Sequence, residues 1–365
     1  MKSSQHSARM VALNVVLVLV LSAGLWAAPA AHAAVYELTG PDMQVIGEDL
    51  HITTHYSDTL VEIARRYGLG YPEITRANPK VDPWLPGEGT PIVIPGRHIL
   101  PPGPRDGIVV NIPEHRLYYF PPARRGHTPT VVTYPVSIGK MDWQTPMGLT
   151  HVVSKQKNPT WNPPASVRAE HLANGDPLPK GVVAAGPDNP LGLFAMRLAI
   201  HPGDYLIHGT NNPLAVGMAV THGCIRMYPE DVAAIFPTVP VGTKVYLINV
   251  PLKVAFVDGN LLLEAHPPVD AQGQSIAPVL SKFEELLNQA LGNTTTAINW
   301  DIAEETLKKA DGIPVLVGLQ ADVDPPAPSV AAQATAPAPE AAPASQVSSA
   351  PAAPAPPRAD RWVTQ

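Results

Sequence analysis

The sequence contains a single cysteine, Cys224, among its 365 residues. A chain with one thiol cannot form an internal disulfide, which excludes a fold held together by disulfides. An excess of basic residues is also lacking, because the formal net charge is -6 and the isoelectric point is about 6.1. Nucleic-acid-binding domains carry a basic face, so we expect no nucleic acid as a partner.

Long apolar runs are absent from the sequence after its N-terminal region. The one such run, residues 10–26, follows Lys2 and Arg9 and precedes Ala31-His32-Ala33, a small-x-small cleavage site. This pattern is typical of a signal peptide over residues 1–33. A membrane anchor is the alternative, but the run is short for a span and no basic cluster follows it. We therefore expect export to the periplasm and no integral membrane span in the mature protein.

Proline, in contrast, is abundant, with 44 residues. These concentrate in residues 324–365 together with Ala, Ser and Gln, a composition that cannot bury enough apolar surface to order the chain. This predicts a disordered tail. Further proline-rich segments divide the rest of the chain into residues 36–97, a stiff linker at 98–104, residues 105–250 and residues 251–320.

Residues 36–97 show a strand–helix–helix–strand pattern. A helix begins after Ser57 or Asp58 and ends at Gly68, a second helix covers residues 71–77, and a strand covers 92–94. The apolar face of the first helix comprises Leu60, Ile63, Ala64 and Tyr67. The segment resembles the lysin motif, a small peptidoglycan-binding module, through Asp58-Thr59-Leu60, Ile63-Ala64, Asn78-Pro79 and Ile94-Pro95. The alternative is a βααβ packing domain without affinity for glycan.

Residues 105–250 are rich in strand signals, and residues 251–320 mix helix and strand. The expected strands of the first segment cover residues 107–111, 116–120, 130–139, 149–153, 205–207 and 243–248. Its one expected helix begins at Pro229. This predicts a mainly β domain, a sandwich or barrel of mostly antiparallel strands. The second segment has a hairpin at Asp258-Gly259-Asn260, helices at 278–291 and 300–310 and a strand at 313–319, which predicts a small α+β appendix.

Cys224 lies in Thr221-His222-Gly223-Cys224-Ile225-Arg226, sixteen residues after His208. A thiol has an ordinary pKa of about 8.5, so it needs a neighbouring imidazole or amide dipoles to react as a thiolate near neutral pH. His208 ends an expected strand and can approach Cys224 across the sheet. His222 is only two residues away, but Gly223 lets the backbone turn and separate the two side chains. Cys224 is therefore a candidate nucleophile.

The neighbours of these residues suit supporting roles. The carbonyl of Gly209 can accept an imidazole N–H and orient the ring of His208. The backbone amides of Gly223 and Cys224 are natural oxyanion donors at the turn. Arg226 can bind a substrate carboxylate through two parallel hydrogen bonds.

Two other interpretations of the cysteine remain open at this point. His201, His208, His222 and Cys224 can offer ligands to a catalytic zinc ion, although their spacing is unlike that of known zinc motifs. A buried, inert cysteine is the second interpretation, and the position of Cys224 between Gly223 and Arg226 argues against it. We expect a thiol–histidine site that needs neither metal nor cofactor.

The two histidine-glycine elements resemble the signature of the L,D-transpeptidases, a His-Gly followed by Ser/Thr-His-Gly-Cys. The similarity spans residues 105–250 and includes Arg116-Leu117-Tyr118-Tyr119, Ser137-Ile138-Gly139, Thr145-Pro146-Met147-Gly148 and Pro159-Thr160-Trp161. It implies that Cys224 is the nucleophile, that His208 is the general acid/base and that His222, Gly223 and Arg226 occupy the supporting positions. Thr221 stands where many members have serine, which preserves the hydroxyl.

The resemblance also implies a reaction in peptidoglycan biosynthesis, and hence a role in cell-wall biogenesis and cell shape. Cys224 attacks a tetrapeptide stem, releases D-alanine and passes the acyl group to an amine, and carbapenems acylate the same thiol. The amine belongs to another stem, giving a 3→3 cross-link, or to a lysine of an outer-membrane lipoprotein. Loop residues 158–164 and 174–189 are candidate walls or lids of the pocket. A cysteine hydrolase that cuts cross-links or detaches lipoprotein, and a non-catalytic wall-binding protein, are the alternatives.

Overall fold

The computed structural model describes residues 34–40, 42–140, 145–268, 279–291 and 296–320. The expected signal peptide and the expected disordered tail lie outside these residues. No helix within the described residues is long and apolar enough to cross a membrane. Contacts join the described residues into one unit.

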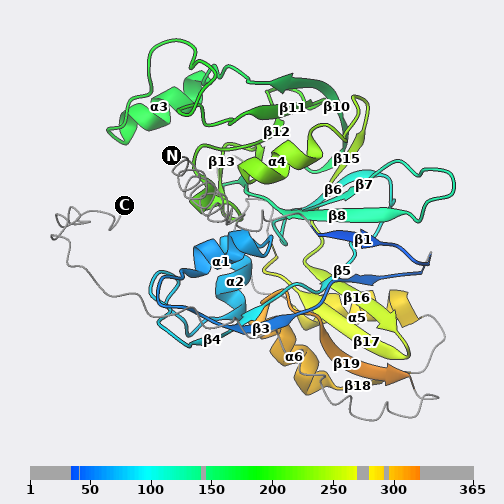
Figure 1. The fold of residues 1–365 in the computed structure, drawn as a ribbon. Helices are drawn as coiled ribbons and strands as arrows, with labels where there is room; N and C mark the ends of the chain where they lie inside the picture. Colours follow the sequence, from blue (N-terminus) through cyan, green and yellow to red (C-terminus); the bar gives the residue numbers. More distant parts are fainter. Residues whose placement is uncertain (1–33, 41, 141–144, 269–278, 292–295, 321–365) are drawn as a thin grey trace, which may run out of the picture. The chain divides into compact units, whose positions relative to one another are not determined.

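A mixed, mostly antiparallel sheet of nine strands forms the centre of the fold (Figure 1). Its strands, in spatial order, are β1 (Val35–Glu37), β8 (Thr130–Pro135), β7 (Arg116–Phe120), β6 (Gly107–Asn111), β15 (Lys244–Ile248), β10 (Gly148–Lys157), β11 (Phe194–Leu198), β12 (Leu206–His208) and β14 (Ile225–Arg226). Two pairs, β6 with β15 and β12 with β14, are parallel. Alternate side chains of these strands form the main core, which includes Ile108, Leu117, Met196, Ile207 and Ile225. A mainly β domain is confirmed.

Smaller elements connect these strands. β9 (Ile138–Gly139) pairs in parallel with β13 (Ala219–Thr221), and a 3₁₀ turn covers Pro213–Ala215. α4 (Pro229–Ile235) begins at the predicted proline, with Glu230 and Asp231 in its first turn. A further helix, α3 (Ala165–Ala173), contradicts the prediction of only one helix between residues 105 and 250. Val167 is its one buried residue, so the sequence lacks the apolar repeat by which a helix is predicted.

Residues 36–97 form β2 (Val45–Ile46), β3 (Leu50–Thr53), α1 (Leu60–Arg66), α2 (Tyr71–Ala77) and β4 (Pro91–Ile94). β3 and β4 pair antiparallel, and α1 and α2 bury Leu60, Ile63, Ala64 and Ile74 between them and this two-stranded sheet. Thr59 caps α1, because its hydroxyl accepts a hydrogen bond from the Glu62 amide. The expected caps were Ser57 and Asp58, and Asp58 instead accepts from the His55 amide. Tyr67, expected on the apolar face of α1, is 38% exposed.

Two features depart from the expected boundaries of this segment. β1 pairs with β8 and so extends the nine-stranded sheet instead of belonging to residues 36–97 (Figure 1). The expected linker begins with β5 (His98–Ile99), which pairs with β2, and both of its residues are buried. A strand that buries its side chains is fixed by packing, so the first part of residues 98–104 is not a free spacer.

The C-terminal segment is a four-stranded sheet with two helices. Its elements are β16 (Leu252–Val257), β17 (Asn260–Ala265), α5 (Leu280–Leu291), β18 (Thr296–Ile298), α6 (Trp300–Lys309) and β19 (Val315–Gln320), and the strand order is β16-β17-β19-β18. The hairpin turn has positive φ at Asp258 and Gly259, as a two-residue type I′ turn requires. Phe283 and Leu287 of α5 and Leu307 of α6 pack against this sheet.

Close contacts connect the first helices to the nine-stranded sheet. The buried guanidinium of Arg116 donates to Glu73 of α2 over 3.0 and 2.5 Å. Arg65 of α1 donates to both carboxylate oxygens of Glu230, at 2.6 and 2.7 Å. The backbones of Gly70 and Gly217 approach so closely that a Cβ on either residue would lie under 3 Å from the other. The chain just before β13 is therefore packed directly against α2.

Candidate active site

The parallel pairing of β12 with β14 brings His208 and Cys224 to one side of the sheet. Ile207 pairs with Ile225, and both side chains point into the core. Since side chains alternate along a strand, Leu206 and His208 of β12 and Cys224 and Arg226 at β14 face the opposite side. All four line one cavity of about 350 Å³. His208 and Cys224 thus face the same cavity from neighbouring parts of the sheet.

The turn that carries Cys224 is held by two threonine hydroxyls. Gly223 adopts φ of 96°, a conformation that favours glycine. Thr145 donates to the Gly223 carbonyl at 3.1 Å and accepts from the Gly139 amide at 3.0 Å. Thr221 donates to the Cys224 carbonyl at 2.6 Å. These bonds fix the backbone carbonyls on both sides of the thiol.

The imidazole of His208 is buried and oriented by the backbone. Nδ1 lies 2.6 Å from the Gly209 carbonyl, so this nitrogen carries the proton and donates, as expected from the sequence. In the neutral ring, Nε2 is then the nitrogen without a proton. Burial, assisted by the positive charge of Arg226, lowers the pKa of His208 to about 3, against the opposing effect of the Gly209 carbonyl. His208 is a neutral base at physiological pH.

The surroundings of Cys224 favour the neutral thiol over the thiolate. Its Sγ lies 3.6 Å from the backbone carbonyl of Asp204 and donates to it. Burial raises the pKa of Cys224 to about 11, although the Leu206 backbone and Arg226 act in the opposite direction. Burial therefore disfavours the thiolate of Cys224 in the unliganded site. The thiol proton has to move to a base as the sulfur attacks.

Alkylation of Cys224 by iodoacetamide is expected to be slow at neutral pH and to rise with pH. Only the thiolate reacts, and a pKa of about 11 leaves on the order of 0.01% thiolate at pH 7, against roughly 3% for an ordinary thiol. The rate should increase about tenfold for each pH unit up to pH 10. Intact-mass kinetics between pH 6 and pH 10 measure this profile, with a cysteine peptide as the reference. A plateau below pH 9 would contradict a buried neutral thiol.

Arg226 extends into the same cavity. Burial lowers the pKa of its guanidinium, while Cys224 raises it. Nε is buried and has no hydrogen-bond partner among the described residues. A buried donor without a partner is costly, so this nitrogen is suited to receive a ligand oxygen. The cavity wall also includes Gln156, Trp161 and the ion pair between Arg197 and Asp204.

His222 is held by a carboxylate from a distant part of the chain. Its Nε2 lies 2.7 Å from Oε2 of Glu170 in α3, and the other carboxylate oxygen of Glu170 pairs with Lys140. The sequence between His208 and Cys224 contains no carboxylate, and Glu170 was not predicted. Spacing in sequence gives no signal for a pair 52 residues apart. Thr145 was noted only as part of a motif, and its hydroxyl contacts explain why a threonine occupies that position.

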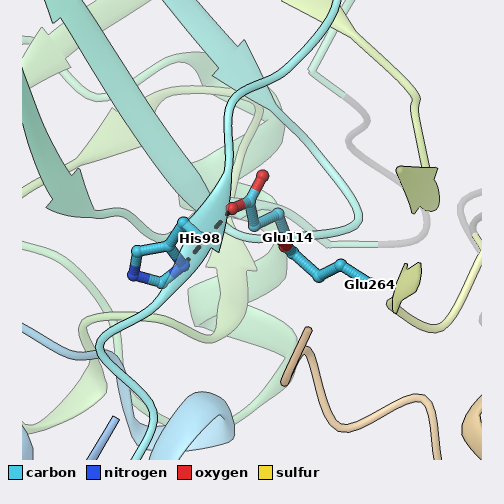
Figure 2. Close-up of side chains that lie close together, drawn as sticks. All are labelled: His98, Glu114 and Glu264. Carbon is cyan, nitrogen blue, oxygen red and sulfur yellow. Dashed lines mark ion pairs between the residues drawn. The ribbon is translucent and has the colours of Figure 1, made fainter. Parts of the chain in front are cut away.

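A group of potential metal ligands lies outside the cavity that contains Cys224. Among the described residues, His98, Glu114 and Glu264 have ligand atoms within 4.8 Å of one another (Figure 2). The ammonium of Lys253 lies 3.0 Å from Glu114 and 2.7 Å from Glu264, where a metal cation would bind. Burial would raise the pKa of Glu114, but Lys253, His266 and the Tyr118 hydroxyl together hold it below its ordinary value. The cluster is thus a buried ionic network whose cation is Lys253.

Comparison with known proteins gives consistent matches. Residues 105–247 match the family model of the L,D-transpeptidase catalytic domain. The "Probable L,D-transpeptidase YcfS" of Escherichia coli K12 is 39% identical over 291 residues, covering 78% of this chain and 88% of that protein. The "Probable L,D-transpeptidase YbiS" of the same strain is 38% identical over 296 residues, covering 78% and 92%. A solved L,D-transpeptidase from Mycobacterium smegmatis aligns with 39% of this chain and 57% of its own, at 20% identity and a TM-score of 0.27.

Proposed function

Since this chain belongs to the L,D-transpeptidase family, we propose that Cys224 is the nucleophile and His208 the general acid/base of a peptidoglycan transpeptidase. The observation that most supports these roles is the shared cavity. His208 faces it from β12 and Cys224 from the residue just before the adjacent parallel strand β14, and Nδ1 of His208 is oriented by the Gly209 carbonyl. The substrate is the tetrapeptide stem of peptidoglycan.

Acylation begins with transfer of the thiol proton. Nε2 of His208 takes the proton from Cys224 as the sulfur attacks the carbonyl of the third stem residue, whose centre has L configuration. The amides of Gly223 and Cys224 stabilise the resulting oxyanion. His208 then protonates the departing D-alanine nitrogen, which leaves a thioester on Cys224. Arg226 binds a stem carboxylate through its buried donor.

Transfer completes the cycle. An incoming amine loses its proton to His208 and attacks the thioester carbonyl, the acyl–sulfur bond breaks, and the sulfur regains a proton. The amine comes from a neighbouring stem, giving a 3→3 cross-link, or from a lysine of an outer-membrane lipoprotein. The reaction takes place in the periplasm, which the chain reaches through the signal peptide of residues 1–33.

Residues 45–97 act as a glycan-binding module of the lysin-motif type. Two loops adjoin at one end of this segment, because Thr54 donates to the Gly87 carbonyl and Leu60 donates to that of Pro83. They carry Tyr56, which is 87% exposed, and Trp84, which is 52% exposed. Exposed aromatic rings can stack on the apolar faces of sugar rings. Such a surface supports retention of the enzyme on its polymeric substrate.

Incubation of the purified protein with tetrapeptide muropeptides tests the function. Mass spectrometry should detect release of D-alanine together with a cross-linked product. A second incubation that includes the lysine-ending C-terminal peptide of a lipoprotein distinguishes the two acceptors. Release of D-alanine or of lipoprotein without any new amide would favour the alternative, a cysteine hydrolase. No reaction in the presence of intact Cys224 would favour a non-catalytic wall-binding protein.

The two histidines are expected to differ strongly in their contributions. His208→Ala should lower the rate of D-alanine release by roughly 100- to 10,000-fold, as loss of general acid–base catalysis does. His222→Ala should have a smaller effect, because its imidazole contacts Glu170 and acts through the geometry of the turn. Single-turnover kinetics on both variants give the comparison. A more severe loss in His222→Ala than in His208→Ala would reverse the two assignments.

A further inference from the structure

Residues 158–193 leave the sheet and return to it at a single point. β10 and β11 pair antiparallel, with Lys157 opposite Phe194. The base of this segment is fastened by Trp161 and Val183, which exchange two backbone hydrogen bonds of 2.9 and 2.7 Å. The side chain of Asn189 donates to the carbonyls of Pro159 and Ala184. The segment is therefore a projecting flap with a fixed base, and it carries α3 (Figure 1).

This flap supplies one wall of the Cys224 cavity. Trp161, Pro164 and Val167 line the cavity together with Cys224 and His208. Val167 is 3% exposed, so the helix lies against protein on this side. The flap thus forms part of the boundary between the cavity and solvent, and Cys224 is partly exposed in this arrangement.

Glu170 connects the flap to the turn that carries Cys224. Its carboxylate contacts His222 at 2.7 Å and also pairs with Lys140. A hydrogen bond from Lys140 and a smaller contribution from the hydrogen bond with His222 lower the pKa of Glu170. Glu170 is therefore ionised at neutral pH. The three side chains are 26–31% exposed. Ion pairs with this exposure are weak, so the contact can open to admit a stem peptide and close again.

We propose that Glu170 is a positioning residue that holds residues 158–193 closed over Cys224 through His222 and Lys140, and that this closure favours amine transfer over hydrolysis. The inference rests on the proposed function. Attack by an amine or by water breaks the same acyl–sulfur bond, giving an amide or a free carboxylic acid, and either nucleophile gives up its proton through His208. Water is small and abundant, so only its exclusion until the amine arrives makes the enzyme a transferase.

Glu170→Gln removes the charge with little change in shape. With muropeptide donor and acceptor, this variant is expected to shift the ratio of hydrolysed to transferred product about fivefold toward hydrolysis, the scale set by a partly exposed ion pair. Lys140→Met should shift the ratio in the same direction. Asp176→Asn is the matched control, because Asp176 lies on the same segment and pairs with His171 inside it. An unchanged ratio in Glu170→Gln would overturn the proposal.

A second measurement tests closure without any transfer reaction. Cys224 is labelled at pH 9 with iodoacetamide, which is small, and with a polyethylene glycol maleimide, which is bulky. Glu170→Gln should raise the rate with the bulky reagent more than the rate with the small one, whereas Asp176→Asn should change neither. If the ratio of the rate with the bulky reagent to the rate with the small reagent is the same in Glu170→Gln as in wild type, closure by Glu170 is overturned. A labelling shift in a protein that performs no transfer would instead reject the proposed function and retain the closing role of Glu170.

Discussion

Cys224→Ala is expected to lose thioester formation and transfer completely. Cys224 is the only thiol in the chain, and the cavity that contains it supplies a base and a buried arginine but no second nucleophile of comparable reactivity among its described lining residues. Loss of a nucleophile that acts as a unit with its base costs on the order of 10⁶-fold in rate. D-Alanine release from tetrapeptide muropeptides, measured by mass spectrometry, should fall below detection.

A carbapenem provides the matched test of the same residue. Its strained cyclic amide resembles the acyl donor, and a bulky acyl group on the sulfur blocks the approach of an amine. Intact mass should show one adduct on the wild-type protein and none on Cys224→Ala. An adduct on both proteins, or on neither, would count against Cys224 as the catalytic thiol. Inhibition of wild type by a zinc chelator would favour the alternative in which Cys224 and the histidines bind metal.

Lys253→Met is expected to give the largest loss of stability. The Lys253 ammonium is buried, donates to the Ile99 carbonyl at 2.6 Å, and pairs with Glu114 and Glu264. Methionine keeps most of the volume but removes the ammonium that lies between two adjacent buried carboxylates. Breaking a buried ion pair in this way costs about 3–5 kcal/mol. For a chain of this size, we expect the Tm to fall by roughly 10 °C, measured by differential scanning calorimetry.

Two controls separate this network from a general effect of removing lysine. Lys308→Met removes an exposed ammonium that pairs only with Glu304 at 3.4 Å, and should leave the Tm nearly unchanged. A triple variant, Lys253→Met with Glu114→Gln and Glu264→Gln, removes the charges together and should regain most of the loss, because no uncompensated charge remains. A Lys253→Met protein as stable as wild type would show that the network contributes no stability.

Local sequence was sufficient for several elements because their determinants are neighbours in the chain. Pro229 with two acidic residues begins α4, and Asp258-Gly259 turns the C-terminal hairpin. Local sequence was insufficient where a partner is remote. α3 buries one apolar side chain and was not predicted, and β1 was assigned to the wrong unit because its pairing with β8 spans about a hundred residues. The N-cap of α1 is Thr59, one residue after the predicted Asp58, because local sequence signals place a helix boundary only to within one or two residues.

The sequence by itself determined the chemical identity of the candidate site. One thiol, two histidine-glycine elements and an arginine at fixed spacing are local facts, and they led to Cys224, His208, His222, Gly223, Gly209 and Arg226. Only the tertiary structure decided the protonation of these groups and their remote partners. The pKa of Cys224 and the contact between Glu170 and His222 depend on burial and on segments distant in the chain. Desolvation and long-range contacts are created by packing, so no local pattern encodes them.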